Sequence, residues 1–162
     1  MIRIAVVTVS DSTSAGLRED KSGPALEARV AELGWTVISR HLVPDETVQI
    51  SGLLSELVHG RAVDVILTTG GTGLAQRDVT PEATRAISNR EIPGFGERMR
   101  AEGLKSTKFA PLSRSTAFTA GTALILNLPG SPRGAVESLD AVAGLIPHAV
   151  DLLHGRTQHE TN

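Results

Sequence analysis

Apolar residues gather in short blocks that are separated by polar turns. Blocks of strand length cover residues 2–9, 63–69 and 123–128, and residues 36–43 form a fourth strand candidate. A block of four to eight apolar residues between turn signals is typical of a strand that is buried on both faces. The pattern therefore predicts four core strands.

Between the strands, apolar residues recur with helical spacing. Leu26, Val30 and Leu33 share one face of a helix that Gly34 ends, and a second helix runs from about residue 48 to residue 58. Because strands alternate with helices, we expect right-handed crossovers and a mostly parallel sheet in an α/β fold.

The second half of the chain carries three further helix patterns. We expect a helix over residues 81–89, a surface-exposed helix over residues 97–105 and a last helix over residues 136–153. Pro147 should break or kink the last helix, because proline cannot donate a helical hydrogen bond.

Two segments and the chain end fit these patterns less well. Residues 92–96 interrupt the helical spacing, and residues 109–121 are ambiguous, with a short helix as the favoured interpretation. No internal repeat or linker marks a second domain. We therefore expect one domain over residues 1–155, followed by a polar tail over residues 156–162.

The loop that follows Thr69 is the most distinctive segment. Residues 70–73 include three glycines, which allow positive φ angles and let backbone N–H groups approach a ligand. Thr80 and Pro81 fit the N-cap and first position of a new helix. A strand, a glycine loop and a helix N-terminus favour an anion such as phosphate. The alternative is a tight turn in which glycine is needed only for steric reasons.

Four loops should meet at one edge of the sheet, because ligands of parallel α/β sheets bind beyond the carboxyl ends of the strands. These loops are the segments at residues 10–11, 44–45, 70–78 and 129–131. They concentrate carboxylates, hydroxyls and glycines, which a purely structural protein does not need. The sequence therefore predicts a ligand site at this edge.

Asp45 and Asp78 give that edge two carboxylates beside a glycine loop. This combination fits Mg²⁺-assisted phosphoryl or nucleotidyl chemistry, since Mg²⁺ takes one or two carboxylates together with phosphate oxygens. The structural alternatives are a helix cap for Asp45, and either a surface pair with Arg77 or a loop hydrogen bond for Asp78. Arg114 and Arg133 lie in predicted loops and have forked donors suited to phosphate; the alternative is that one of them is solvated.

Composition excludes several classes of function. The 162 residues have a formal net charge of −2 and no basic block, so we expect no nucleic-acid partner. Cysteine is absent, which excludes disulfides, a thiol nucleophile and a cysteine zinc site. The histidines show no metal spacing, and Arg98 and Arg100 are expected on a solvated helix face. Without a signal-peptide pattern or a membrane span, a soluble cytoplasmic protein is expected.

Seven motifs occur in the order found in one known family. They are Thr-Val-Ser-Asp-Ser (8–12), Asp-Lys-Ser-Gly-Pro (20–24), Val-Pro-Asp-Glu (43–46), Thr-Gly-Gly-Thr-Gly (69–73), Arg-Asp-Val-Thr-Pro-Glu-Ala-Thr (77–84), Leu-Ser-Arg-Ser (112–115) and Asn-Leu-Pro-Gly-Ser-Pro (127–132). With them the chain resembles the MoaB/Mog family of molybdenum-cofactor biosynthesis, to about Leu153. Residues 77–81 are most similar to the adenylyltransferase branch, and the family varies at the position of Ser131.

The resemblance implies a three-layer α/β sandwich and an activity. That activity is transfer of AMP from Mg-ATP to the terminal phosphate of molybdopterin, with release of pyrophosphate. It also implies Mg²⁺ as cofactor, a homotrimer, and a molybdate-insertion protein that receives the adenylylated product.

By the same resemblance, Asp45 and Asp78 are the essential acids and the metal ligands. The residues implied to bind nucleotide phosphates are Ser10, Asp11, Thr69, Gly70, Gly71, Thr72 and Gly73. The residues implied to bind molybdopterin are Ser22, Gly23, Ser113, Arg114, Asn127, Pro129, Gly130 and Ser131.

Three other functions stay open at this point. A non-catalytic paralogue would hold or shuttle molybdopterin, and a hydrolase would act on a nucleotide diphosphate. A pure scaffold would leave the clustered loops unexplained. Pyrophosphate release that depends on Mg²⁺ and ATP separates the first from the transferase, and slow ATP loss without a pterin acceptor would favour the second.

Overall fold

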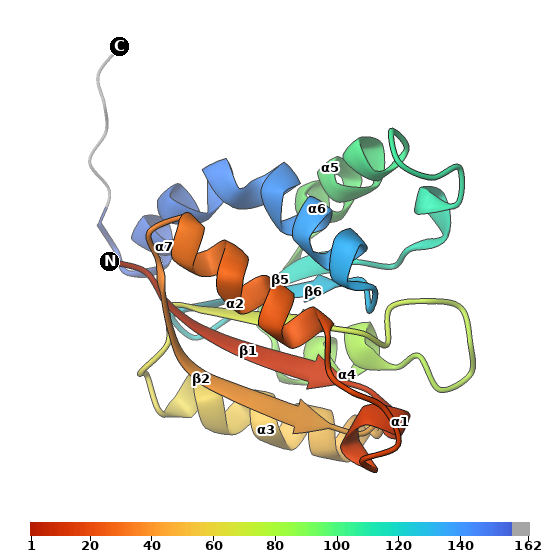
Figure 1. Ribbon diagram of the computed structural model, residues 1–162. Coiled ribbons are helices and arrows are strands. Elements are labelled where there is room, and N and C mark those ends of the chain that lie inside the picture. The colour runs from red at the N-terminus through yellow and green to blue at the C-terminus, as the bar shows by residue number, and fades with distance from the viewer. Residues whose placement is uncertain (157–162) are drawn as a thin grey trace.

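Six strands form one sheet in the order β2-β1-β3-β6-β5-β4 (Figure 1). The computed structural model describes residues 1–156, and residues 157–162 of the expected tail lie outside the described part. The strands are β1 (Arg3–Val9), β2 (Thr36–Val43), β3 (Val65–Thr69), β4 (Arg90–Ile92), β5 (Thr116–Ala120) and β6 (Ala123–Leu128). β1, β2, β3 and β6 are parallel, whereas β5 is antiparallel to β6 and β4 is antiparallel to β5. The expectation of a mostly parallel sheet is confirmed.

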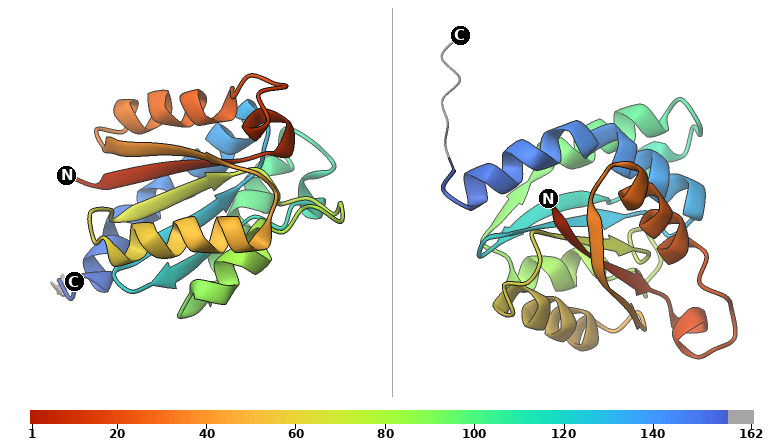
Figure 2. Two further views of the ribbon diagram at one scale, coloured as in Figure 1. Left: turned by 90° about the horizontal axis from the view of Figure 1, so that it is seen from below. Right: turned by 60° about the vertical axis from the view of Figure 1, so that its left-hand side comes forward.

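Helices cover both faces of this sheet, which makes three layers (Figures 1 and 2). One face carries α2 (Ser22–Glu32), α5 (Pro93–Gly103), α6 (Pro132–Val142) and α7 (Ile146–Leu153). The other face carries α3 (Thr47–His59) and α4 (Thr80–Ile87). Short turns complete the fold: α1 (Asp11–Ser14), η1 (Ala110–Leu112) and η2 (Ala143–Leu145). The three-layer α/β sandwich is therefore confirmed.

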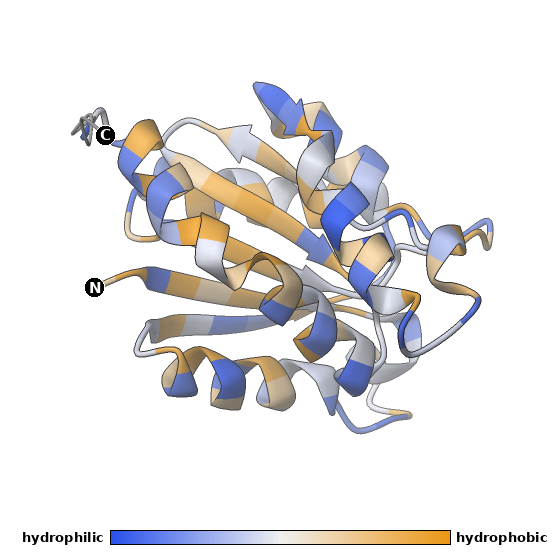
Figure 3. Ribbon diagram, turned by 90° about the horizontal axis from the view of Figure 1, so that it is seen from above, coloured by the Kyte–Doolittle hydropathy of each residue, from blue (hydrophilic) through white to orange (hydrophobic). Residues whose placement is uncertain are grey.

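β1 shows why the apolar blocks become central strands. Ile4 and Val6 pack into the core under α2 and α6, while Ala5 and Val7 pack into the core under α3. Successive side chains of a strand point to opposite faces, so a strand between two helical layers must be apolar at every position. The apolar colouring of the central strands and the mixed colouring of the helices agree with this (Figure 3).

The prediction of a short helix over residues 109–121 is wrong for most of the segment. Only η1 is helical, and residues 116–120 form β5. Gly121 has φ +56 and allows the tight turn through which β5 pairs with β6, with Ala120 opposite Ala123. The segment therefore forms a strand because it pairs with the buried strand β6. Its sequence does not alternate between apolar and polar residues, so it gave no local sign of a strand.

The region around Pro93 also differs from the sequence interpretation. Residues 90–92 form the edge strand β4, and Pro93 begins α5 instead of interrupting a pattern. Phe95 and Met99 are 6% and 3% exposed, so α5 is not a surface helix. The last helix is broken as predicted, but the break lies at η2, because Pro147 sits in the first turn of α7. In residues 1–156, every helix is too short or too polar to cross a lipid bilayer.

Asp64 directly precedes β3 and lies at the end of the sheet opposite the glycine loop. Its carboxylate accepts hydrogen bonds from the backbone N–H of Arg3 at 2.8 Å and from Arg3 Nη2 at 2.7 Å. The Arg3 guanidinium holds the pKa of Asp64 below its usual range. The ionised Asp64 carboxylate therefore stabilises the fold at pH values above the unfolded-state pKa of about 3.9. This contribution is lost as the pH falls through the lower folded-state pKa.

Replacing Asp64 with Ala should therefore lower the free energy of unfolding by about 1–3 kcal/mol, because a partly buried N–H and a partly exposed guanidinium lose their acceptor. Chemical denaturation at neutral pH measures the change. Asp140→Ala is the control, since Asp140 pairs with Arg29 at the surface and should cost less than about 1 kcal/mol. Equal losses in the two variants would contradict this assignment.

Candidate active site

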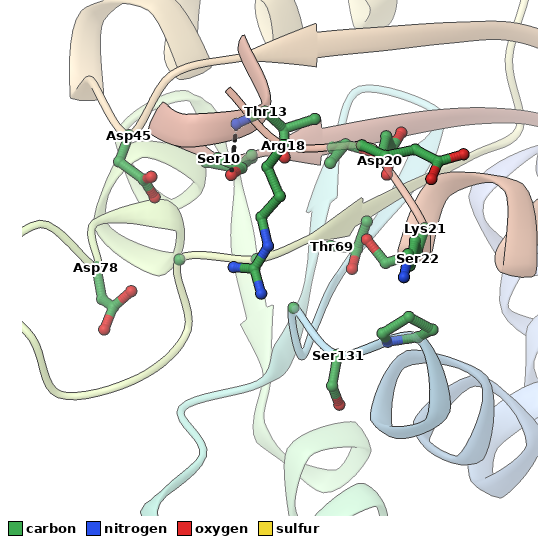
Figure 4. A pocket seen from close by; sticks show the side chains of 17 residues that line it. Ser10, Thr13, Arg18, Asp20, Lys21, Ser22, Asp45, Thr69, Asp78 and Ser131 are labelled. Atoms are coloured by element: carbon green, nitrogen blue, oxygen red, sulfur yellow. Dashed lines mark hydrogen bonds between the residues drawn. The ribbon is translucent and has the colours of Figure 1, made fainter. Parts of the chain in front are cut away.

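A cavity of about 470 Å³ lies at the carboxyl ends of the parallel strands (Figure 4). Loops that follow β1, β2, β3 and β6 all line it, through Ser10, Asp45, Gly70 and Ser131 among others. Parallel strands end at the same edge of a sheet, so loops far apart in the sequence converge there. The prediction that these four loops meet at one edge is confirmed.

The glycine loop has the backbone conformations that its composition predicts. Gly70 and Gly71 have φ +107 and +67, which side chains other than glycine rarely adopt. A Cβ on Gly70 would lie 2.2 Å from the carbonyl oxygen of Val9, and a Cβ on Gly71 would lie 2.2 Å from Thr80 Oγ1. The steric explanation is thus real, and it accompanies the position of both residues on the cavity wall.

Backbone donors remain available in this loop. The N–H of Gly70 donates to the carbonyl oxygen of Leu128 at 3.1 Å, so it is already used. Within residues 1–156, the hydrogen bonds found do not include the N–H groups of Gly71, Thr72 or Gly73 as donors. Unpaired N–H groups on a concave loop are suited to an anion.

The two predicted acids lie on the same cavity (Figure 4). Asp45 Oδ2 accepts the N–H of Asp11 at 2.9 Å, and Asp78 Oδ2 accepts the N–H of Ala75 at 2.9 Å. The second oxygen of each carboxylate, Oδ1, has no hydrogen bond within the described chain. Each acid is therefore held by one oxygen and presents the other.

The helix-cap alternative for Asp45 and the Arg77-pair alternative for Asp78 do not match the contacts, whereas the loop hydrogen bond expected as the other alternative for Asp78 is present. The side chain of Asp45 does not cap α3, whose N-cap has no side-chain hydrogen bond. Arg77 pairs with Asp11 and Glu46, with Nη2 at 2.9 Å from each carboxylate, and not with Asp78. Asp11, expected among the phosphate-binding residues, instead joins the loops through Arg77 and the N–H of Asp45.

Electrostatics at the acids favour a cation. Burial raises the pKa of Asp45, and the negative charges of Asp11 and Asp78 raise it further, while a hydrogen bond from the Asp11 backbone opposes the shift. The Arg77 guanidinium lowers the pKa of Asp11. A half-buried carboxylate with two like charges nearby gains stability when a positive ion binds between them.

A second cavity, of about 490 Å³ and more open to solvent, adjoins the first. It shares Gly71, Asp78 and Gly130 with the first cavity. Its other lining residues are Thr72, Gly73, Leu74, Leu112, Ser113 and Pro129. Asp78, Gly71 and Gly130 therefore lie where the two cavities meet.

Each cavity is lined both by residues expected to bind nucleotide and by residues expected to bind molybdopterin. Ser22 and Ser131, expected on the molybdopterin side, line the first cavity together with Ser10, Thr69 and Gly70. Thr72 and Gly73, expected at nucleotide phosphates, line the second cavity with Ser113, Pro129 and Gly130. The two cavities thus do not follow the division that the resemblance implies.

Asp11, Gly23, Arg114 and Asn127 line neither cavity. Arg114 donates to the carbonyl oxygens of Gly73 at 2.8 Å and Asp78 at 2.6 Å, and it pairs with Glu82, so its donors hold the loop. A Cβ on Gly23 would lie 2.4 Å from Asp20 Oδ2. Gly23 therefore gives the Asp20 carboxylate room at the start of α2.

Asn127 is completely buried beneath the glycine loop. Its Nδ2 donates to Thr68 Oγ1 at 2.9 Å and to Thr84 Oγ1 at 3.0 Å. Thr84 donates to the carbonyl oxygen of Thr80, whose own Oγ1 donates to the carbonyl oxygen of Gly70 at 2.8 Å. Asn127 thus belongs to a buried hydrogen-bond chain that fixes the loop from below.

Several site features were missed from the sequence. The loop between α1 and α2 supplies Arg18, Glu19, Asp20 and Lys21 to the first cavity. The motif at residues 20–24 could have indicated the last two, but no pattern marks Arg18. One arginine also differs from expectation. Arg100 is half-buried, and its Nη1 donates to the carbonyl oxygens of Ser113 and Ser115. Arg133 pairs with Glu137 at the surface, which agrees with the solvated alternative and not with a phosphate clamp.

Comparisons with known proteins agree with this geometry. The family model described as "Probable molybdopterin binding domain" matches residues 5–148. The molybdopterin adenylyltransferase of Escherichia coli K12 is 41% identical over 168 residues, which span 95% of this chain and 86% of that protein. The enzyme of the same name from Helicobacter pylori J99 is 42% identical, covering 95% and 89% of the two chains.

A solved structure gives the same result in three dimensions. The molybdopterin biosynthesis enzyme MoaB of Thermus thermophilus superposes with a TM-score of 0.90 at 48% identity, covering 96% of this chain and 98% of that chain. The chain therefore belongs to the MoaB/Mog family of molybdopterin-binding domains.

Proposed function

We propose that this protein is a molybdopterin adenylyltransferase, which transfers AMP from Mg-ATP to the terminal phosphate of molybdopterin and releases pyrophosphate. The observation that carries the proposal is the position of Asp78 at the junction of two cavities, with Asp45 beside it. A transferase must hold a donor and an acceptor in contact, and this arrangement supplies two adjoining compartments. The names of the curated relatives support the same activity and do not favour a binding-only paralogue.

The first cavity suits the nucleotide. Gly71 lies on its wall with an unpaired N–H, and Thr69 and Ser10 add hydroxyl groups. The second cavity suits the pterin, because Leu74, Leu112 and Pro129 give it apolar surface and Ser113 gives it a hydroxyl. The unpaired N–H groups of Thr72 and Gly73 also belong to residues that line this second compartment.

The residues fit Mg²⁺ as the cofactor. Asp45 and Asp78 each present one carboxylate oxygen, and their mutual repulsion contributes to the raised pKa of Asp45. Residues 1–156 hold no group of three or more carboxylate or histidine ligands, so protein ligands alone do not complete a site. Mg²⁺ commonly keeps water and takes substrate phosphates alongside one or two carboxylates. When bound, it would supply positive charge to the phosphates of ATP.

The chemical step needs positioning more than proton transfer. A phosphate oxygen of molybdopterin attacks the α-phosphorus of ATP, a new P–O bond forms, and the bond between the α-phosphorus and the bridging oxygen breaks. Pyrophosphate leaves with that oxygen and its electron pair. The attacking phosphate is already an anion, so this chain must orient it, exclude water and neutralise charge. Loop N–H groups are suited to orienting the phosphates and neutralising their charge, and the fixed carboxylates would hold the cation.

Pyrophosphate release tests the proposal. Purified protein with ATP, Mg²⁺ and molybdopterin should release one pyrophosphate for each adenylylated pterin formed, and omission of any component should stop the reaction. Pterin binding without pyrophosphate would support the non-catalytic paralogue. Phosphate or pyrophosphate release from ATP without pterin would support a hydrolase.

The proposal includes an acid limit on activity. Burial, with Asp11 and Asp78 adding negative charge, raises the pKa of Asp45, and a protonated carboxyl does not bind a cation. The KM for Mg²⁺ should therefore rise as the pH falls, beginning above the ordinary aspartate pKa of about 3.9. Steady-state rates at a series of Mg²⁺ concentrations and pH values measure this. A KM for Mg²⁺ that stays constant down to about pH 4 would contradict the metal role of Asp45.

Assembly and location complete the proposal. Following the family resemblance, we propose a homotrimer that passes its product to a molybdate-insertion protein in the cytoplasm. Light scattering coupled to size-exclusion chromatography gives the mass of the assembly. A monomer at micromolar concentration would remove the trimer from the proposal and leave the activity unaffected.

A further inference from the structure

Arg18 is a cavity residue that no sequence motif or periodicity marks. It lies in the loop between α1 and α2, and its side chain extends across the first cavity (Figure 4). The guanidinium ends in the middle of the labelled side chains, with Asp78 on one side and Thr69 on the other. An arginine in this position presents a planar set of donors to whatever occupies the cavity.

Other arginines close to the loops are already occupied. Arg77 pairs with Asp11 and Glu46, Arg114 holds the glycine loop and pairs with Glu82, and Arg133 pairs with Glu137. In contrast, Figure 4 draws no hydrogen bond between Arg18 and another residue that lines the cavity, and the ion pairs found in residues 1–156 do not include Arg18. Within that part of the chain, the guanidinium of Arg18 is thus the free forked donor on this cavity.

Carboxylates outnumber cationic side chains on the lining of the first cavity. Glu19, Asp20, Asp45 and Asp78 bring four carboxylates to the lining, while Arg18 and Lys21 bring two cations. Asp20 is partly compensated by hydrogen bonds from Thr8 and from the N–H of Gly23. A polyphosphate entering a cavity with an excess of carboxylates needs cationic partners besides a metal ion.

We propose that Arg18 is a substrate-binding residue that grips the triphosphate of ATP through its guanidinium. This inference rests on the proposed function, because it takes ATP as the occupant of the first cavity. Arginine binds phosphate oxygens in a bidentate way, and a hydrogen bond to a charged group is among the stronger kinds in proteins. Arg18 therefore sets affinity for the triphosphate, while Asp45 and Asp78 serve the metal.

Equilibrium binding to three variants tests the inference. Arg18→Ala should weaken binding of Mg-ATP about 10- to 100-fold, which corresponds to the loss of a charged hydrogen bond. Arg18→Lys should recover part of the affinity, since it keeps the charge and loses the fork. Arg90→Ala is the matched control, because Arg90 is an exposed arginine on the edge strand β4. Isothermal titration gives each dissociation constant, and thermal denaturation verifies that each variant is folded.

Two further probes identify what Arg18 holds. Inorganic tripolyphosphate with Mg²⁺ should lose affinity by the same factor as ATP in Arg18→Ala, whereas molybdopterin should bind as it does to the parent. Loss of molybdopterin affinity in place of ATP affinity would overturn the assignment, since the terminal phosphate of the pterin would then be the ligand. Unchanged ATP affinity in a folded Arg18→Ala would also overturn it.

Failure of the proposed function would be distinguishable from failure of this inference. If the parent protein does not bind Mg-ATP, the adenylyltransferase proposal itself is wrong. If the parent binds Mg-ATP and releases pyrophosphate but Arg18→Ala does so equally well, only the role of Arg18 is wrong.

Discussion

Replacing Asp78 with Asn is expected to lower turnover by about 10²- to 10³-fold, the usual effect of removing one group that stabilises charge in a transition state. Asp78 lies where the two cavities meet, and its Oδ1 is not engaged by another group in the described chain. Asn keeps the size of the side chain and can accept the N–H of Ala75, so the fold should persist. Steady-state formation of adenylyl-molybdopterin measures the effect.

The control for this experiment is an aspartate far from the cavities. Asp151 lies on α7 and pairs with Arg156 at the surface, so Asp151→Asn should retain the activity of the parent. Molybdopterin affinity of Asp78→Asn, measured in parallel, should change much less than turnover. If turnover of Asp78→Asn stays within a few-fold of the parent, Asp78 has neither a metal nor a catalytic role.

Replacing Gly70 with Ala is expected to reduce stability by about 3–5 kcal/mol and to abolish nucleotide binding. The added Cβ would meet the Val9 carbonyl oxygen at 2.2 Å, and alanine does not favour φ +107. The steric clash and the unfavourable φ angle both involve backbone that neighbouring strands hold in place. The loop must therefore shift, and its unpaired N–H groups move with it. Urea denaturation and isothermal titration with Mg-ATP measure the two effects.

Gly52 provides the matched glycine control. It lies on α3 without a positive φ, and no atom would lie within 4 Å of an added Cβ. Gly52→Ala should stabilise the protein by about 0.5–1 kcal/mol, because alanine restricts the unfolded chain and favours a helix. If Gly70→Ala loses little stability, or gains stability, the loop relaxes without strain, and the steric role of Gly70 is contradicted.

The central strands were predictable because burial on both faces of a sheet requires a short run of mostly apolar residues, which is visible in the local sequence. β1, β3 and β6 are buried at nearly every position and most of their residues are apolar, so a short sequence window is enough to find them. β5 was not found, because its side chains do not alternate and its pairing with β6 decides its structure. β4 is a three-residue edge strand that depends wholly on β5. Pairing of this kind is a tertiary property that local propensity does not reveal.

The candidate site was predictable to the extent that its residues follow strand ends. Asp45, Asp78 and the glycines are brought together by the topology of a parallel sheet, which the alternation of elements already implies. The partners of individual side chains were not predictable. Arg114 holds the glycine loop and Asn127 supports it from the core, so both appear in motifs without lining a cavity. Arg18 depends on the path of a polar loop, which no periodicity fixes.

A crystal structure with Mg²⁺, a non-hydrolysable ATP analogue and molybdopterin would show whether one sheet edge holds both substrates on either side of Asp78. We expect the triphosphate in the first cavity beside Gly71 and Arg18, the pterin in the second cavity, and metal bound by the carboxylates of Asp45 and Asp78. A nucleotide bound outside the first cavity, or a metal ligated by neither aspartate, would show that the two substrates do not meet at Asp78.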